Sequence, residues 1–599
     1  MPHYKTPLQK ILFTLESVVG ASRLNACSAY SDYDATLGAT ILGEAAKLAE
    51  DVLAPLNRTG DSRPARLADG AVSTPPGFVE AYGAFATGGW SGIAADPEFG
   101  GQGLPHTLAV AVEEVWQSSN LAFGLCPLLT HGAIEALTAH GSDELKRIYL
   151  PKLIDGSWTG TMNLTEPMAG SDVGALKTRA VKAGDGTYRI TGQKIYITWG
   201  EHDCAENIVH LVLARLAGAP PGTRGISLFL VPKYLPDAQG KPAARNDLTC
   251  VGLEHKLGIH GSPTCTMSFG DQDGAIGFLI GQENRGMAAM FTMMNSARLN
   301  VGVQGVAIAE RALQKALAYA GERQQGKPFG LQHEGSEMVP ILRHPDVRRM
   351  LLSMQAGVEA ARAICLATAV AIDLARHHPD EAGRRRAKGR EGLLTPIAKA
   401  WSTDLGVRVA SLGVQVHGGA GFIEQTGAAQ YYRDARILPI YEGTNGIQAI
   451  DLVTRKIGLQ DGAAVEALFS DIEDPIGPLA DGGSPSLPVI ASALAMTLDA
   501  AQGATAWLRG RLASGKPYDA LAGATPFLEM MGTLIGGHFL ARGAIAASQG
   551  LGSGTGDRAF LASRLAAARF FAETELPHAA GLVAAVTSGA ETLYASEFD

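Results

Sequence analysis

Three separated segments combine residue types that can do chemistry. The first, MNLTEPMAGSDVGALKTRA at Met162–Ala180, places small residues and hydroxyl groups around a Glu166-Pro167 turn. Thr165 and Ser171 supply hydroxyls, and the glycine-rich backbone lets N–H groups approach a flat polar ring closely. An ordinary turn has the same composition, so this segment alone does not distinguish a binding loop from a connection.

The second segment, KIYITWGEHD at Lys194–Asp203, is typical of a strand that ends at a glycine. Strand alternation puts Tyr196 and Thr198 on one face, which presents an aromatic surface together with a hydroxyl group. The alternative is an ordinary strand whose aromatic residue lies in the core.

The third segment, GVQVHGGAGFIEQTGAAQYYRDARILPIYEGTNGIQ, spans Gly413–Gln448. It contains a permissive turn at Gln415 and its glycines, followed by Glu442 in an apolar run. Apolar neighbours would desolvate the Glu442 carboxylate, raise its pKa and make it a stronger base near neutrality. The alternative is a glutamate in the first turn of a helix, where it only favours the macrodipole.

The surrounding sequence predicts helices, then strands, then helices again. Short β-branched and aromatic runs at residues 187–199, 207–215, 225–231 and 264–269 are bounded by turn residues and predict strands. Helical periodicity flanks them on both sides. We therefore expect a mainly helical α+β fold, divided into residues 1–160, 161–286, 287–460 and 461–599.

Two stretches predict connections rather than helices. Residues 461–487 are rich in Asp, Gly, Pro and Ser, which is typical of a linker before the last helical part. The basic run RHHPDEAGRRRAKGREG at Arg376–Gly392 fits either an anion site or a solvated loop between helices. Its composition favours the loop.

Charge and composition exclude several classes of protein. The formal charge of −9 argues against nucleic-acid binding. The 6 cysteines form no CxxC pair and the 15 histidines no metal-binding spacing, so neither a disulfide framework nor a metal site is expected. No secretory signal and no long uninterrupted apolar span is present, which predicts a cytoplasmic protein without a membrane span. No GxGxxG follows a strand, which argues against a Rossmann site.

Taken together, the three segments resemble the acyl-CoA dehydrogenase family. Its TEPxAGSD loop, ITxG strand end, QxxGGxGF turn and YEGT are all present in the family's order, and the resemblance covers residues 40–460. It implies an N-terminal helical domain, a central β-barrel-like domain and a C-terminal four-helix bundle. An extra C-terminal helical domain would place the chain in a subgroup of longer members.

The resemblance implies FAD, held without a Rossmann fold between the β domain and the bundle. Thr165 would lie at the polar edge of the flavin, Tyr196 would shield its ring and Thr198 would bond near N5. The full set placed along this cofactor is Met162, Leu164, Thr165, Ser171, Tyr196, Thr198, Thr444 and Gly446.

In the family a second subunit typically holds the adenine end of FAD. The matching positions here are Arg323, Gln415, Gly418 and Gly419. Phe329 is the matching aromatic, although 3 extra residues separate it from Arg323 compared with the family's Arg-x-x-Phe-Gly pattern.

Glu442 matches the catalytic base of the family. It would remove the α-proton of an acyl-CoA thioester while the β-hydrogen leaves as hydride to the flavin, forming an α,β double bond. Some members place the base on another helix, where this chain has Ala297, which cannot act. The positions that match the substrate site are Ser171, Arg298, Tyr441 and Gly443.

The resemblance also implies partners, and two other functions stay open. A dehydrogenase passes its electrons to an electron-transfer flavoprotein, whereas an acyl-CoA oxidase with the same base would return them to O₂. A non-enzymatic acyl-CoA-binding relative would have lost the flavin. We expect a homo-oligomer, and a dimer rather than a tetramer if the C-terminal extension covers the face that smaller relatives use.

Overall fold

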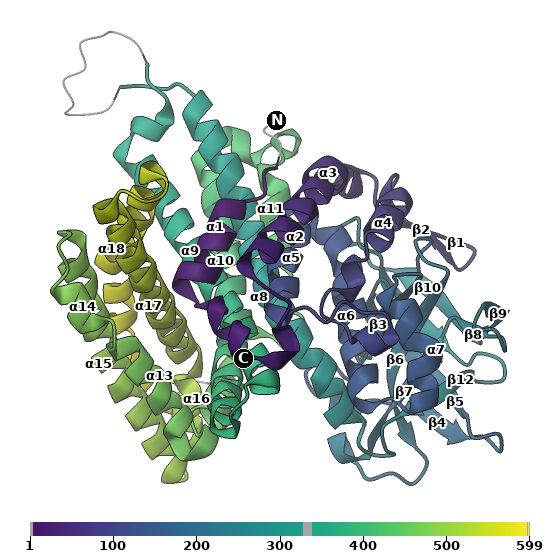
Figure 1. Ribbon diagram of the computed structural model, residues 1–599. Helices are drawn as coiled ribbons and strands as arrows, with labels where there is room; N and C mark the ends of the chain where they lie inside the picture. The colour runs from purple at the N-terminus through teal and green to yellow at the C-terminus, as the bar shows by residue number, and fades with distance from the viewer. Residues whose placement is uncertain (1–3, 328–337, 596, 598–599) are drawn as a thin grey trace. The chain divides into compact units, whose positions relative to one another are not determined.

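The computed structural model describes residues 4–327, 338–595 and 597. The chain forms two compact units, Glu44–Asn300 and Met1–Gly43 with Val301–Asp599 (Figure 1). We call the first the sheet unit and the second the helical unit. The predicted fold class is confirmed: the molecule is mainly helical, with one large sheet in the middle of the chain. The four-part division stays a prediction.

The sheet unit is built around eight strands. They are β3 (Trp158–Asn163), β4 (Arg179–Lys182), β5 (Tyr188–Thr198), β6 (Asn207–Leu216), β7 (Ile226–Pro232), β10 (Leu248–Leu253), β11 (Thr264–Phe269) and β12 (Ala275–Ile280). Their order is β10-β11-β5-β12-β7-β6-β3, and β4 pairs with both β5 and β6. That double pairing closes β4, β5, β12, β7 and β6 into a barrel-like ring without free edges. All four predicted strands are present.

Two short hairpins lie outside this sheet. They are β1 (Arg66–Ala68) with β2 (Ala71–Ser73), and β8 (Tyr234–Pro236) with β9 (Pro242–Arg245). The helices of the unit are α2 (Ala35–Leu48, which begins before the boundary), α3 (Ala54–Ser62), α4 (Phe78–Thr87), α5 (His106–Ser119), α6 (Leu121–His140), α7 (Asp143–Ile154) and the start of α8 (Gly286–Glu322).

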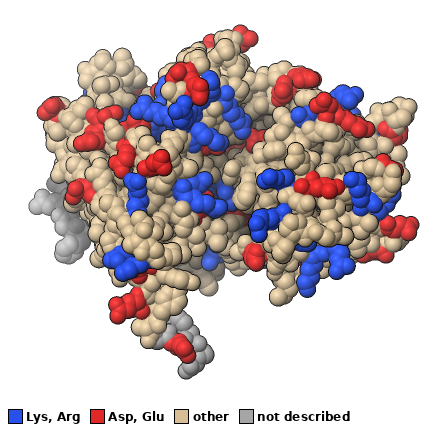
Figure 2. Space-filling model, turned by 90° about the horizontal axis from the view of Figure 1, so that it is seen from below, with Lys and Arg blue, Asp and Glu red and all other residues tan. Residues whose placement is uncertain are grey.

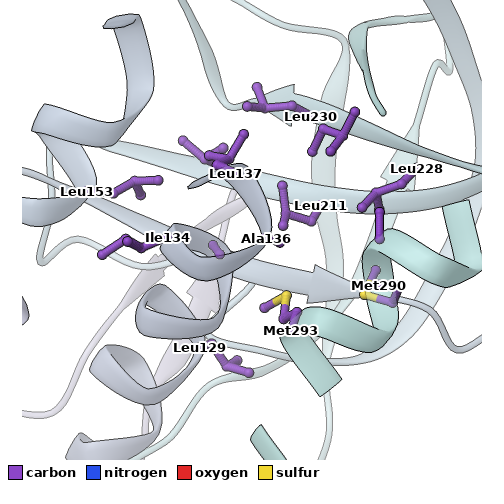
Figure 3. Close-up of a cluster of buried hydrophobic side chains, with 14 of the residues drawn as sticks. Leu129, Ile134, Ala136, Leu137, Leu153, Leu211, Leu228, Leu230, Met290 and Met293 are labelled. Atoms are coloured by element: carbon purple, nitrogen blue, oxygen red, sulfur yellow. The ribbon is translucent and has the colours of Figure 1, made fainter. Parts of the chain in front are cut away.

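One apolar core joins the helices of this unit to the sheet. Figure 3 shows Leu137 of α6 and Leu153 of α7 facing Leu211 and Leu230 of the strands, with Met290 of α8 nearby. Apolar, buried side chains lie on every face of α6, which is typical of a helix enclosed within a protein core. By length and composition α6 and α15 (Ser486–Ala513) could cross a membrane, and 83% of the α6 window is buried inside the protein.

The helical unit contains the long helices. They are α1 (Leu8–Phe13), the rest of α8, α9 (Pro345–His377), α10 (Glu381–His417), α11 (Ala428–Ala435), α12 (Asn445–Asp451), α13 (Ala463–Glu473), α14 (Ile476–Ala480), α15, α16 (Pro517–Ala522), α17 (Ala524–Ser553), α18 (Arg558–Gly581) and α19 (Val583–Thr587). Within this unit α17 packs against α9, α10 and α12, and α18 packs against α15 and α17.

Two predicted connections are helical in the structure. The basic run is not a loop, because α10 begins at Glu381 and its Asp380 cap accepts a hydrogen bond from the Gly383 amide at 2.9 Å. Arg, Lys, Ala and Glu are strong helix formers, which outweighs the scattered glycines. The predicted linker is also wrong: α13 and α14 occupy residues 463–480, and only short turns separate them from α15.

The C-terminal extension meets α10 at Trp401. The buried Trp401 indole donates a hydrogen bond from Nε1 to Thr533 Oγ1 of α17 at 3.1 Å. A Cβ added at Gly532 would lie 2.4 Å from the Trp401 ring, so the close approach of α10 and α17 requires glycine there. The extension is therefore packed into the helical unit.

This contact predicts that Gly532→Ala lowers the free energy of unfolding by about 2 kcal/mol, because the rigid indole must move. Gly503 of α15 is the matched control, since a Cβ there meets nothing within 4 Å. Gly503→Ala should raise stability by about 1 kcal/mol through helix propensity. Urea unfolding of both variants provides the measurement, and equal effects would contradict the argument.

Candidate active site

The first sequence segment forms a loop after β3. Met162 and Leu164 are half-buried and pack against the core of the sheet unit. The Thr165 carbonyl accepts a hydrogen bond from the Ile195 amide of β5 at 2.9 Å, which holds the loop beside that strand. Ser171 is exposed. The fold thus brings the predicted loop and the predicted strand together.

A buried ion pair that no local sequence pattern indicated fixes this loop. Glu166 Oε1 lies 2.8 Å from Lys194 Nζ, and both side chains are almost fully buried. The Glu166 carboxylate also accepts hydrogen bonds from the Lys177 and Thr178 amides. Burial lowers the pKa of Lys194 to about 8, although Glu166 opposes the shift. Lys194 Nζ also donates to the Leu164 carbonyl at 3.0 Å, so one ammonium group joins strand and loop.

Tyr196 lies on a β-bulge rather than in regular alternation. Cys265 of β11 pairs with Ile197 and Met267 pairs with Lys194, so the strand carries one extra residue at this point. Tyr196 has a left-handed φ of +60° and its side chain is 60% exposed. The alternative of a core aromatic is therefore wrong. Ile197 is buried and Thr198 is partly exposed, so Tyr196 and Thr198 are both accessible.

Glu442 lies in a strained turn of the helical unit. Its φ is +56°, and Gly443 follows with +83°. The cap of α12 is Thr444, so Glu442 precedes the helix and does not occupy its first turn. The first-turn alternative therefore does not describe this residue. A left-handed glutamate costs about 1–3 kcal/mol, and such strain concentrates where side-chain direction is functional.

Several hydrogen bonds hold this turn in place. Asn445 Oδ1 accepts from Lys399 Nζ at 2.8 Å and from Thr403 Oγ1 at 3.3 Å, while its Nδ2 donates to the Ala400 carbonyl at 3.1 Å. The Tyr441 hydroxyl donates to Gln304 Oε1 of α8. Burial, then the charge of Glu442, raises the pKa of Tyr441, so its phenol stays protonated. Thr444 is half-buried and Gly446 is exposed in the same turn.

The residues predicted for the adenine end gather elsewhere in the helical unit. Arg323 follows α8, and Gln415, Gly418 and Gly419 lie at the end of α10. The rings of Tyr319 and His417 stack with centroids 4.4 Å apart, which joins these two helix ends. Arg323 is 19 residues beyond Gln304, or about 28 Å along α8. Phe329 lies outside the described residues.

Arg298 of α8 belongs to the sheet unit and is 8% exposed. Its Nη1 donates to Asn295 Oδ1 at 3.3 Å, and its guanidinium lies 5.9 Å from the Phe291 ring centroid. Ala297 is buried in the core cluster. These two contacts within α8 help to hold the buried Arg298 side chain.

A polar cavity of about 60 Å³ lies beside this part of α8, within the sheet unit. Its polar lining comprises Ser91, His106, Glu113, His131, Glu135, Ser296 and Asn300. Glu113 Oε1 accepts from Gln117 Nε2 at 2.7 Å, but Oε2 has no hydrogen-bond partner among the described residues and lies 3.9 Å from His131 Nδ1. Burial raises the pKa of Glu113 to about 7 and lowers that of His131 to about 4. No sequence motif indicated this pair.

Family models match nearly the whole chain in four consecutive segments. "Acyl-CoA dehydrogenase, N-terminal domain" matches residues 40–157, its "middle domain" 161–272 and its "C-terminal domain" 284–457. "Acetyl-CoA dehydrogenase C-terminal like" matches residues 467–597, which are the C-terminal extension.

Known proteins match over the full length as well. The chain is 47% identical to a 3-methylmercaptopropionyl-CoA dehydrogenase of Ruegeria pomeroyi, over 98% of this chain and 99% of that one. It is 34% identical to a butyryl-CoA dehydrogenase of Syntrophomonas wolfei, over 98% and 97%. The structure of an acyl-CoA dehydrogenase of Bacillus anthracis complexed with FAD has the same fold, with a TM-score of 0.74, 20% identity and coverage of 96% and 91%.

The Glu113 cavity predicts a pH-dependent stability. Because the folded pKa is about 7 and the unfolded value near 4.5, the native state binds more protons between these values. Stability therefore falls as pH rises through this window, by roughly 2 kcal/mol between pH 5 and pH 8. Glu113→Gln should remove that loss. The opposite contribution of His131 is present in both proteins and cancels. The measurement is the urea midpoint of wild type and of Glu113→Gln at pH 5 and pH 8. If the midpoint changes equally with pH in both proteins, the prediction is refuted.

Proposed function

The chain belongs to the acyl-CoA dehydrogenase family, and from that premise we propose that Glu442 is the base of an FAD-dependent dehydrogenation. The reaction introduces an α,β double bond into an acyl-CoA thioester, and the electrons pass to an electron-transfer flavoprotein. The left-handed backbone of Glu442 is the observation that carries this assignment. A glutamate of no chemical use gains nothing from that conformation, which glycine adopts at lower cost.

The described residues fit FAD in the groups that they expose. Tyr196 offers an accessible aromatic ring, while Thr165 and Thr198 offer partly exposed hydroxyls. Cβ atoms added at Gly419 and Gly446 would meet nothing within 4 Å, so there is space beside the backbone there for phosphate and ribose oxygens. When bound, FAD supplies the acceptor for the hydrogen that leaves the β-carbon.

The chain's own residues handle the proton and its surroundings. Glu442 takes the α-proton at a carboxylate oxygen, which requires the ionised side chain in the resting enzyme. The neutral phenol of Tyr441 beside it keeps its proton and does not compete. Asn445 and the Tyr441–Gln304 hydrogen bond hold the chain on both sides of Glu442. Arg298, Ser171, Tyr441 and Gly443 are each assigned to the acyl-CoA substrate.

The proposed substrates are short acyl-CoA thioesters, including those with a thioether in the acyl chain. Support comes from the names of the two full-length relatives, which act on 3-methylmercaptopropionyl-CoA and butyryl-CoA. The former, at 47% identity, makes the sulfur-containing acyl group the first to test. An anaerobic panel from butyryl-CoA to longer chains, read by loss of flavin absorbance, ranks the substrates by rate.

The electron acceptor separates this proposal from an oxidase. A dehydrogenase in air with a cognate electron-transfer flavoprotein should reduce that protein and form little peroxide. An oxidase should form one peroxide per double bond without any protein acceptor. Peroxide produced at the rate of substrate loss would reverse this part of the proposal and leave the role of Glu442 intact.

We predict that Glu442→Gln stays yellow but loses flavin reduction by acyl-CoA. The amide cannot accept the α-proton, and loss of a general base costs about 10²–10⁴-fold in rate. Stopped-flow absorbance under anaerobic conditions gives the reduction rate at saturating substrate. Glu424→Gln is the control, because Glu424 is an exposed side chain paired with Arg433. Wild-type reduction in Glu442→Gln would overturn the assignment of the base.

The adenine-end residues predict a site shared between two subunits. Arg323 lies about 28 Å along α8 from the residue that contacts Tyr441, so the two sets of residues stand well apart on the helical unit. In the family a second subunit typically holds the adenine end, and this supports sharing here. We therefore propose a homodimer in which Arg323, Gln415, Gly418 and Gly419 hold the FAD of the partner subunit. The extension packed on α9 and α10 supports a dimer rather than a tetramer.

Co-expression of two inactive variants tests this sharing. In a heterodimer of Glu442→Gln and Arg323→Ala subunits, shared sites leave one site with both changes and one with neither. Activity should then return to about half of the wild-type value per dimer. If Arg323 serves its own subunit, the heterodimer has no intact site and stays inactive. Sedimentation velocity on the wild-type protein should give a dimer, and a stable tetramer would contradict the proposed assembly.

A further inference from the structure

A groove of about 250 Å³ lies between the first turns of α10 and α13 in the helical unit. Its walls carry Arg385, Arg386 and Arg390 of α10. Its floor is formed by small and apolar side chains of α13, namely Ala463, Ala464, Ala467 and Leu468. These arginines belong to the basic run Arg376–Gly392, for which the sequence allowed either an anion site or a loop.

Helical spacing puts two of these arginines on one face. Arg386 and Arg390 are four residues apart, and the adjacent Arg385 also lines the groove. The chain as a whole carries a charge of −9, so the groove has the opposite sign to the molecule. Figure 2 shows that Lys and Arg gather in groups on the face seen from below.

The groove has more cations than its own acidic groups can neutralise. Asp471 is the one carboxylate among its lining residues, and it lies 2.5 Å from Arg390 in an ion pair. Arg385 makes an exposed pair with Glu381 at 3.3 Å. Among the residues that the structure describes, the Arg386 guanidinium has neither an ion pair nor a hydrogen bond.

Two further arginines share the field of Asp471. Partial burial and the charge of Arg390 lower the pKa of both Arg23 and Arg542, while Asp471 opposes the shift. Arg542 also adds to the shift of Arg23. Three guanidinium groups therefore share the field of one carboxylate, although Arg23 and Arg542 do not line the groove. This excess of positive charge favours an additional anion nearby.

We propose that this groove binds the phosphate group of a small phosphorylated molecule. Arg385 and Arg386 contact the phosphate oxygens, because the planar guanidinium matches two such oxygens at once. The methyl groups of the alanine floor contact an apolar part of the same ligand. The volume exceeds that of a bare ion, which favours a phosphate attached to a larger body.

The test measures binding of inorganic pyrophosphate to the FAD-loaded protein by isothermal titration calorimetry. Wild type is compared with the double variant Arg385→Gln/Arg386→Gln, which leaves the Arg390–Asp471 pair intact. The double variant Arg348→Gln/Arg349→Gln is the charge-matched control, because both are exposed, adjacent arginines on α9 and Arg349 is paired with Asp346 as Arg385 is with Glu381. The expected result is a wild-type dissociation constant below about 1 mM that weakens about tenfold or more in the double variant only.

Other results would overturn the proposal. Equal affinities in wild type and the double variant would mean that pyrophosphate binds elsewhere, for instance where FAD or acyl-CoA phosphates lie. If wild type gives no heat of binding up to about 10 mM pyrophosphate, a site with the expected dissociation constant below about 1 mM is excluded. Binding to phosphatidylglycerol vesicles or to a glutamate-rich peptide that pyrophosphate does not displace would assign the arginines to a membrane or a protein instead.

Discussion

The left-handed backbone of Glu442 is the constraint that the surrounding helices of the helical unit must satisfy. A residue with a side chain does not stay at a φ of +56° without strong contacts on both sides. On one side Tyr441 bonds to Gln304 of α8, and on the other Asn445 is held by Lys399, Thr403 and Ala400 of α10. Hydrogen bonds to α8 on one side and to α10 on the other therefore hold the Glu442 turn in place. Its position is as well determined as the packing of those helices.

That dependence gives the C-terminal extension a physical role. The stretch of α10 that holds Asn445 carries Trp401 on another face, where the indole packs against the glycines of α17. The extension thus buries the side of α10 that faces away from the Glu442 turn. A shorter chain would leave that side exposed or would need a neighbouring subunit to cover it. The first turns of the same helix bear the arginine groove, so α10 joins three regions of the unit.

The sequence predicts the three motifs well, but it does not predict the distant side chains and strand pairing that hold them in place. The loop at Thr165, the strand at Tyr196 and the turn at Glu442 are each recognisable from a few adjacent letters. Lys194 and Lys399 are not, because their partners lie 28 and 46 residues away and only the fold brings them together. The β-bulge at Tyr196 depends on the register with β11, which no local pattern reveals. Residues 376–392 and 461–487 were misread because glycine and charge suggest loops even where helix formers prevail.

The Glu166–Lys194 pair shows why such hidden supports are kept. A buried ion pair adds little net stability, since apolar side chains of the same shape serve as well or better. Its value here is directional: the ammonium group donates to the Leu164 carbonyl, and the carboxylate collects two amides beyond the loop. An apolar pair would fill the space without fixing either end of the loop. Charge is retained where the protein needs the backbone around Thr165 in one conformation, which is the same requirement that Asn445 meets for Glu442.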